Sequence, residues 1–222
     1  MNHGKFVISL DFELMWGVIE SRSIDGYGKN ILGVHQVIPR LLDIFNKYGI
    51  KGTFSTVGFL FFENKKTLLE HAPQNIPTYQ YGKLSPYHGY MDKVGQNTAE
   101  DPYHFAQQLV KQILEQPHHE MGTHTFSHYF CLEEGQTIDQ FREDLRAAQK
   151  AASLYNITLT SLIFPRNQFN AAYLEVCKEE GLLCYRGNPG SWLYKERIKQ
   201  AESRWRRALR LADAYINISG HH

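Results

Sequence analysis

The sequence has few cysteines, no long apolar run and almost no net charge. Its three cysteines, Cys131, Cys177 and Cys184, are an odd number without paired spacing, which does not describe a disulfide framework. A reducing compartment is the simpler setting for such a chain. Near the N-terminus, the mostly apolar residues 6–10 are interrupted by Asp11, so the run is too short for a signal-peptide core or a membrane span. We therefore expect a cytoplasmic protein without a membrane span.

The balance of charge also excludes a class of partners. Lys and Arg number 24 against 23 Asp and Glu, which leaves a formal net charge of +1. This balance does not support bulk electrostatic binding of nucleic acid or of an anionic membrane. The 222 residues, 42% of them hydrophobic, are enough for a sizeable core. We find no internal repeat and no linker that divides the chain, so we expect one domain over residues 1–222.

Apolar runs alternate with stretches of helical periodicity along most of the chain. Short apolar runs predict buried strands at residues 6–10, 50–57, 119–123, 159–164 and 182–185, with residues 214–218 as a candidate last strand. The remaining periodic stretches predict helices at residues 34–48, 59–71, 101–116, 137–155, 171–180 and 195–212. Strand followed by helix is the pattern of parallel βα units. The sequence therefore predicts an α/β fold.

Glycine and proline set the expected boundaries between these elements. Residues 18–33 are rich in glycine and polar side chains and predict a loop. Pro39 lies inside the next helical pattern, so we expect that helix to kink or to begin close to it. Asp101 followed by Pro102 predicts a helix start, with Asp101 as N-cap.

A long aromatic segment at about residues 72–100 breaks the pattern. It contains three prolines and four tyrosines. A loop of this length in a compact domain is usually a functional insertion or disordered. Its tyrosines would suit stacking on a sugar face, and they would equally suit packing of the loop onto the body.

Two histidines, His124 and His128, stand four positions apart just after the third predicted strand. Imidazole nitrogen is the commonest protein ligand for a divalent transition metal, and this spacing can place both rings on one side. The alternative is a pair of ordinary hydrogen-bonded histidines, since the chain has 11 His. Two imidazoles leave an ion short of ligands, so a metal site here requires a carboxylate from elsewhere in the chain.

The best candidates for that carboxylate follow the first predicted strand. Asp11 and Glu13 would point to the same side if the extended conformation continues through them. Two carboxylates aimed one way at the end of a buried strand are costly unless a cation or hydrogen-bond donors meet them. A pair that faces water is the alternative, and the buried character of the preceding strand favours a functional pair.

Three motifs then occur in one order. Asp11-Phe-Glu13 follows the first strand, His124-Thr-Phe-Ser-His128 the third, and Arg166-Asn-Gln-Phe169 the fourth. This order resembles the polysaccharide deacetylases, carbohydrate esterase family 4, which have a NodB homology domain. The resemblance covers roughly residues 5–192 and is strongest at the motifs, although the first has one residue inserted and Glu in place of a second Asp. It implies an irregular (β/α) barrel of the NodB type.

The resemblance also implies roles for the motif residues. Zinc or a similar divalent ion would be held by Glu13, His124 and His128, with Asp11 as the catalytic base; the two acids could exchange these roles. Arg166 would hold Asp11 in place and keep it ionised. Phe169 and the later Trp192 would contribute to substrate binding. The implied reaction is removal of an N-acetyl group from a saccharide, which in the cytoplasm would be a saccharide precursor.

The chain departs from the family pattern in its last part. The fourth motif of the family sets an acidic residue beside a Trp, and here Ser191 precedes Trp192. A late histidine that assists the leaving group is expected beyond a further βα unit, so we expect a barrel that is incomplete at its C-terminus. Two other functions therefore stay open: hydrolysis of another non-peptide C–N amide bond on the same fold, or sugar binding without turnover.

Overall fold

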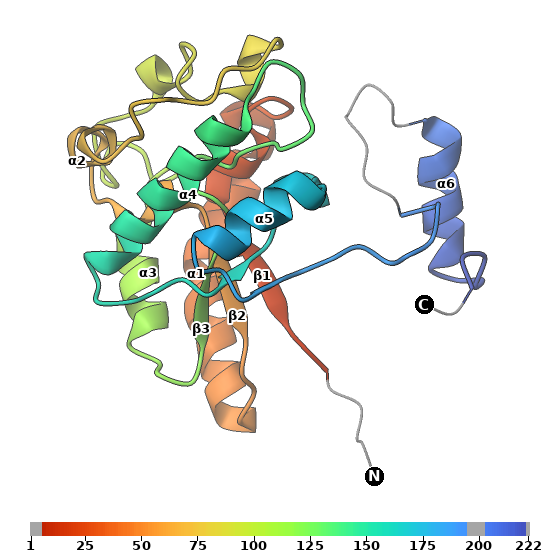
Figure 1. Ribbon diagram of the computed structural model, residues 1–222. Helices are drawn as coiled ribbons and strands as arrows, with labels where there is room; N and C mark the ends of the chain where they lie inside the picture. The colour runs from red at the N-terminus through yellow and green to blue at the C-terminus, as the bar shows by residue number, and fades with distance from the viewer. Residues whose placement is uncertain (1–5, 195–202, 221–222) are drawn as a thin grey trace.

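The computed structural model describes residues 6–194 and 203–220 of the chain, and its centre is a parallel sheet of five strands. The strands lie side by side in the order in which they occur in the sequence (Figure 1). They are β1 (Ser9–Phe12), β2 (Thr53–Thr56), β3 (Glu120–Thr123), β4 (Ser161–Leu162) and β5 (Cys184–Tyr185). Each one falls within or beside an apolar run that predicts a strand.

Helices of two kinds connect the strands. The α-helices are α1 (Ile24–Tyr48), α2 (Lys65–Glu70), α3 (Gln107–Leu114), α4 (Ile138–Ser153), α5 (Ala171–Glu179) and α6 (Arg204–Asp213). Short 3-10 helices are η1 (Leu14–Val18), η2 (Gly58–Phe61), η3 (Gly82–Leu84), η4 (Met91–Lys93) and η5 (Pro165–Asn167). Among the helices of the described segments, none combines the length and the apolar character that crossing a membrane requires.

The two faces of the sheet differ because side chains alternate along each strand. Leu10, Phe54 and Met121 are aligned across β1, β2 and β3 and belong to the main core, which α1, α3 and α4 cover. The next row, Asp11, Ser55 and Gly122, points to the opposite face. The sheet therefore has one apolar face under helices and one polar face.

The sheet is curled into half of a barrel. Arg186, directly after β5, donates to Asp11 and Ser9 on β1, so the two edge strands approach each other on the polar face. No strand within residues 6–194 or 203–220 pairs with both β5 and β1 to close the ring. The architecture is the incomplete (β/α) barrel that the motifs implied.

Helix α1 begins earlier than predicted and continues through Pro39. It begins at Ile24, inside the expected loop, because the Ser23 hydroxyl caps it by accepting from the Gly26 N–H. A Cβ on Gly28 would lie 2.8 Å from the Tyr103 ring, so that glycine allows close packing rather than a turn. Pro39 lies inside the helix, which runs on for 25 residues in all. The predicted loop is thus wrong for its second half.

Two further expectations are wrong. Asp101 does not cap a helix; its carboxylate accepts from Gly95, Tyr103 and His104, and α3 begins only at Gln107. Residues 214–218 follow α6 as a turn and not as a strand. The first part of the helix expected at 195–212 lies outside the described residues, and its later part is α6.

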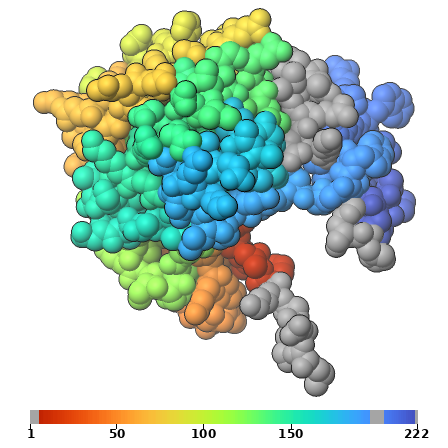
Figure 2. All heavy atoms as spheres, in the orientation of Figure 1, coloured from red at the N-terminus to blue at the C-terminus, as the bar shows by residue number. Residues whose placement is uncertain are grey.

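The aromatic segment 72–100 lies over the carboxyl ends of the strands and contains η3 and η4. In the space-filling view it covers the top of the molecule (Figure 2). Two of its tyrosines pack onto the body: the Tyr79 hydroxyl accepts from the Phe130 N–H at 2.9 Å, and the Tyr87 ring meets the Phe59 ring edge-on. The insertion is therefore structured, and it borders the end of the sheet where parallel βα folds place their sites.

Candidate metal centre

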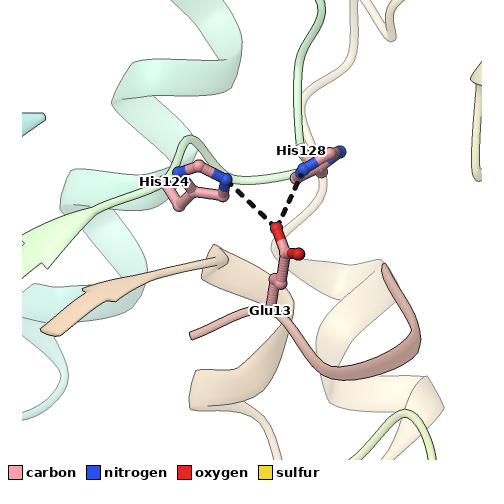
Figure 3. A group of neighbouring side chains, drawn as sticks. All are labelled: Glu13, His124 and His128. Carbon is pink, nitrogen blue, oxygen red and sulfur yellow. Dashed lines mark ion pairs between the residues drawn. The ribbon is translucent and has the colours of Figure 1, made fainter. Parts of the chain in front are cut away.

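One carboxylate and two imidazoles meet at the carboxyl ends of β1 and β3. Oε2 of Glu13 lies 3.2 Å from Nε2 of His124 and 3.1 Å from Nε2 of His128. Figure 3 shows the carboxylate pointing at both rings. Among the described residues, these three form the group of acidic, His or Cys side chains whose candidate ligand atoms all lie within 4.8 Å of one another.

Glu13 reaches the histidines because the backbone turns sharply after β1. Leu14 has a φ of 47°, in the left-handed region, and η1 begins there. Gly17 in η1 leaves the space that the carboxylate fills, since a Cβ there would lie 2.0 Å from Cδ of Glu13. The turn separates Glu13 from the direction of β1, so its role cannot be deduced from strand alternation alone.

The loop between the two histidines is held by its own backbone and by η2. Thr125 and His128 both have left-handed φ values, 65° and 60°. The Thr125 hydroxyl donates to the His124 carbonyl and accepts from the Tyr129 N–H. The N–H groups of Gly58 and Phe59 donate to the carbonyls of Thr125 and Phe126. The imidazoles therefore project from a tight turn and not from one face of a helix.

Asp144, from α4, is the buried anchor of this turn. Its carboxylate accepts from the N–H groups of Phe126 and Ser127 and from the Ser127 hydroxyl, and it is fully buried. Burial raises the pKa of Asp144 to about 6, because the three hydrogen bonds only partly offset the loss of solvent. No sequence motif singles out Asp144, whose role depends on the packing of α4 against the loop.

The histidine rings are oriented for metal binding. Nδ1 of His124 donates to the Ile163 carbonyl at 2.8 Å, which leaves Nε2 as the free lone pair toward Glu13. Nδ1 of His128 is buried and has no hydrogen-bond partner in the part of the chain that the structure describes. The His128 ring packs against the edge of Phe130, with ring centroids 4.9 Å apart.

The electrostatics of the group favour an ionised carboxylate and a neutral imidazole. Burial alone would raise the pKa of Glu13, but the close contacts with His124 and His128 outweigh burial and hold that pKa far below its usual value. Burial lowers the pKa of His128, and the Glu13 charge opposes this only in part. An anionic oxygen and neutral imidazole nitrogens are the forms that bind a divalent ion.

The donor set fits a zinc-type ion. Two imidazole Nε2 atoms and one carboxylate oxygen, all converging, are a ligand set that catalytic zinc sites use, with further positions left for water or substrate. The carbonyl partner of His124 and the space at Gly17 are the supporting contacts that such ligands require.

The arginines are arranged differently from the prediction. Arg166, which was expected to hold Asp11, instead pairs with Glu20 at 2.5 Å and Glu133 at 2.9 Å. Asp11 is held by Arg186, whose two terminal nitrogens lie 3.0 Å from its two carboxylate oxygens. Both arginines follow a strand, so position along the chain could have drawn attention to Arg186, but no motif does.

The family described as polysaccharide deacetylase matches residues 25–185, which is more than half of the chain and includes His124, His128 and Arg166. The chain belongs to the polysaccharide deacetylase family. Asp11 and Glu13 lie before the matched segment.

Several solved structures resemble the chain at low sequence identity. A CE4 family pseudoenzyme from Bacillus anthracis is 14% identical, with a TM-score of 0.46, over 81% of this chain and 42% of its own. A de-N-acetylase from Aggregatibacter actinomycetemcomitans is 13% identical, with a TM-score of 0.43, over 81% of this chain and 61% of its own. A family 4 acetyl xylan esterase from Clostridium thermocellum, in complex with a cobalt ion, is 15% identical, with a TM-score of 0.40, over 93% of this chain and 67% of its own.

The chain spans less than half of the pseudoenzyme's length. A comparison with curated proteins gave no match.

The two aromatic residues that the deacetylase resemblance assigned to substrate binding lie in different settings. Phe169 stacks on Phe164 and meets the edge of Tyr185, with ring centroids 5.1 and 5.2 Å apart. Trp192 is 63% exposed, and its carbonyl accepts from the Arg206 guanidinium of α6. Phe169 is thus part of the packing around β4 and β5, whereas the Trp192 ring is open to solvent.

Proposed function

We propose that this polysaccharide deacetylase family member is a metal-dependent hydrolase that removes N-acetyl groups from a saccharide. The observation that carries the proposal is the convergence of Glu13, His124 and His128, with Nε2 of both rings within 3.2 Å of one carboxylate oxygen. These residues would hold a divalent ion, with zinc as the expected metal. When bound, the ion supplies a Lewis acid that lowers the pKa of water and polarises the acetamide carbonyl.

Asp11 is the proposed general base. It lies on β1, two residues before Glu13. Its carboxylate is about one third exposed, so a water molecule can reach it. In the proposed reaction, Asp11 takes the proton from the attacking water.

Arg186 takes the role first expected of Arg166. Its two parallel contacts with Asp11 fix the plane of the carboxylate, as bidentate arginine–carboxylate pairs do. Arg166 supports the site differently: it joins Glu20 and Glu133, and its guanidinium lies 4.0 Å above the Phe130 ring that packs on His128.

The unpaired cysteines support a cytoplasmic setting, in which the substrate would be a saccharide precursor. We treat the chain as one domain in this proposal. The two substrate-binding candidates, Phe169 and Trp192, are part of it as well; the exposed ring of Trp192 suits stacking on a sugar.

Acetate release tests the proposal. The protein would be loaded with Zn²⁺ or Co²⁺ and incubated with N-acetylated monosaccharides and oligosaccharides, and with non-sugar amides. We expect acetate from a sugar, and its loss on His124→Ala but not on His118→Ala, a histidine at the opposite end of β3. Turnover of non-sugar amides alone would indicate another C–N hydrolase. Sugar binding without turnover, unchanged by His124→Ala, would contradict the proposal.

A further inference from the structure

A cavity borders η1, which begins directly after Glu13. It has a volume of about 670 Å³ and is enclosed by residues 19–25 and by the part of the insertion around His88, Tyr90 and Lys93. Met15 and His104, both buried, also line it. This volume is typical of small-molecule sites. None of the motifs discussed so far contributes a residue to it.

The cavity has a surplus of positive charge. Arg22, Lys83 and Lys93 line it, and neither lysine forms an ion pair within the described residues. The Arg22 guanidinium lies 5.6 Å from the centre of the Tyr27 ring. Asp25 and Glu20 are the acidic residues that line the cavity, and Glu20 is already paired with Arg166. A concave site with excess positive charge attracts anions.

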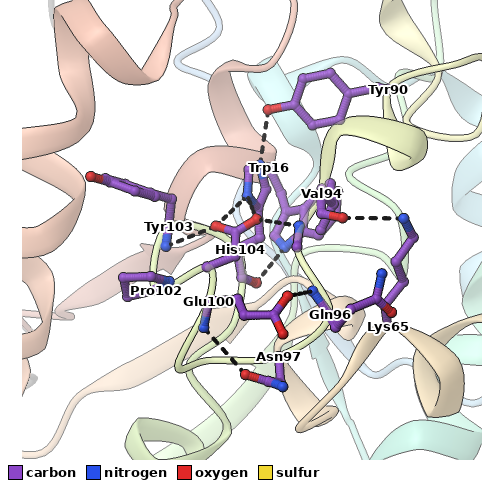
Figure 4. Close-up of polar contacts among 12 residues, drawn as sticks. Trp16, Lys65, Tyr90, Val94, Gln96, Asn97, Glu100, Pro102, Tyr103 and His104 are labelled. Carbon is purple, nitrogen blue, oxygen red and sulfur yellow. Dashed lines mark hydrogen bonds and ion pairs between the residues drawn. The ribbon is translucent and has the colours of Figure 1, made fainter.

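One wall of the cavity is fixed by a buried polar network. Nδ1 of His104 lies 2.8 Å from both carboxylate oxygens of Asp101, and Nε2 lies 2.9 Å from the Tyr90 hydroxyl. The Trp16 indole donates to the His104 carbonyl. Figure 4 shows how these contacts tie η1 to the insertion. The network holds the Tyr90 hydroxyl in place at the cavity, where its oxygen can accept a hydrogen bond from a sugar hydroxyl.

A chain of side-chain contacts links the cavity to the metal centre. Glu20 lines the cavity and pairs with Arg166, whose guanidinium lies over the Phe130 ring, and Phe130 packs on His128. Met15 lies two residues after Glu13 on η1. A saccharide with its acetamide at the metal centre could therefore extend into the cavity.

We propose that this cavity binds an acidic group, a phosphate or a carboxylate, carried by the saccharide substrate. The proposal rests on the proposed deacetylase function. Lys83 and Lys93 provide mobile ammonium groups for that anion, and Arg22 provides a guanidinium held against Tyr27. Tyr90 fixes the orientation of the sugar between the anion and the acetamide.

Matched substrates test this assignment. Acetate release from N-acetylglucosamine, its 6-phosphate, its 1-phosphate and the corresponding 6-carboxylate would be measured at low and high salt. We expect at least one charged sugar to have a KM about tenfold lower than the neutral sugar, with a difference that shrinks as salt rises. Comparison of the phosphorylated sugars with the 6-carboxylate identifies the acidic group. A neutral sugar that is used as well as every charged one would overturn the proposal.

Reversing the charge of the two lysines tests whether they cause the preference for the charged sugar. The Lys83→Glu, Lys93→Glu double variant should lose the preference for the charged sugar over the neutral sugar. Lys66→Glu, on exposed α2 and away from the cavity, is the matched control and should keep the preference. A preference that survives the double reversal would place the anion elsewhere. All three positions are exposed, and circular dichroism checks that each variant folds.

A binding readout separates this proposal from the catalytic one. N-acetylglucosamine 6-phosphate and N-acetylglucosamine would be titrated calorimetrically into the full chain and into the double variant. If no sugar releases acetate, the proposed function fails, yet tighter binding of the phosphate that the double variant loses would still support the cavity. Equal binding of both sugars, at any level of turnover, would overturn it.

Discussion

The guanidinium of Arg186 contacts both carboxylate oxygens of Asp11, with two nitrogen–oxygen distances of 3.0 Å. The pair joins the end of β5 to β1 across the polar face of the half-barrel. Both side chains are more than one third exposed, so the pair contributes about 0–1 kcal/mol to folding. Its importance is expected to lie in the position of Asp11.

Arg186→Met should therefore reduce activity without a comparable loss of stability. We expect kcat to fall about tenfold or more, because the proposed base loses the group that fixes its plane. The midpoint of urea unfolding should stay close to that of the wild-type protein. Measured acetate release and unfolding curves on the same preparation check both parts. Unchanged kcat would remove Arg186 from the proposed mechanism.

Arg166→Met should instead reduce stability more than activity. The Arg166 side chain pairs with Glu20 and Glu133, whose side chains are only 5% and 3% exposed. Removing the cation from two buried carboxylates should lower the free energy of unfolding by about 3 kcal/mol. Urea denaturation measures this directly. A smaller loss of unfolding free energy in Arg166→Met than in Arg186→Met would show that the roles of the two arginines are exchanged.

Gly17→Ala should weaken metal binding. A Cβ at Gly17 would lie 2.0 Å from Cδ and 2.2 Å from Oε1 of Glu13, so the carboxylate must leave its place between the imidazoles. We expect the affinity for Zn²⁺ to fall about 10–100-fold, as when a supporting contact of a ligand is lost. Competition with a chromogenic chelator measures it.

Gly33→Ala is the matched control. Nothing lies within 4 Å of a Cβ at Gly33, which is inside α1. This change should leave zinc affinity unchanged and raise the free energy of unfolding by about 0.5–1 kcal/mol. Equal zinc affinities of the two variants would show that Glu13 does not need the space at Gly17.

Asp144→Asn should reveal the pH dependence of the turn that carries the histidines. The pKa of Asp144 is raised from 3.8 to about 6, so the unfolded chain loses this proton at lower pH than the folded protein does. The contribution of Asp144 to stability is therefore greatest below about pH 4, falls by about 3 kcal/mol up to about pH 6, and stays low above that pH.

The difference in unfolding free energy between wild type and Asp144→Asn isolates this effect. Glu13 and the histidines titrate in both proteins, so their contributions largely cancel, and both would be measured with a chelator present. We expect the unfolding free energy of the wild type to fall relative to that of Asp144→Asn as pH rises from 4 to 6. A difference independent of pH would mean that Asp144 is not a strained buried carboxylate.

Local patterns in the sequence predict the strands and the two imidazoles well. The strands follow from short apolar runs, and His124 and His128 follow from their spacing and position after β3. The partner of Asp11 does not follow, because Arg166 and Arg186 both come after strands and only the curl of the sheet brings one of them to β1.

Three other features depend on tertiary contacts in the same way. The turn that brings Glu13 to the imidazoles includes Leu14 with a φ in the left-handed region, and the sequence does not predict this backbone conformation. Asp101 has the pattern of a helix cap, but His104 and Gly95 engage its carboxylate instead. Gly28 lies in a glycine-rich stretch that predicts a loop, yet it is helical. The Tyr103 ring packs where a side chain at this position would lie. In each case a distant residue overrides the local preference.

Anomalous scattering at the zinc edge, from crystals of the zinc-loaded protein, tests the central claim most directly. The account predicts one strong peak between Oε2 of Glu13 and the Nε2 atoms of His124 and His128, and its absence in crystals of Glu13→Gln grown in the same way. A peak elsewhere with none among these three atoms, or a peak at this position that Glu13→Gln leaves at full strength, would contradict it.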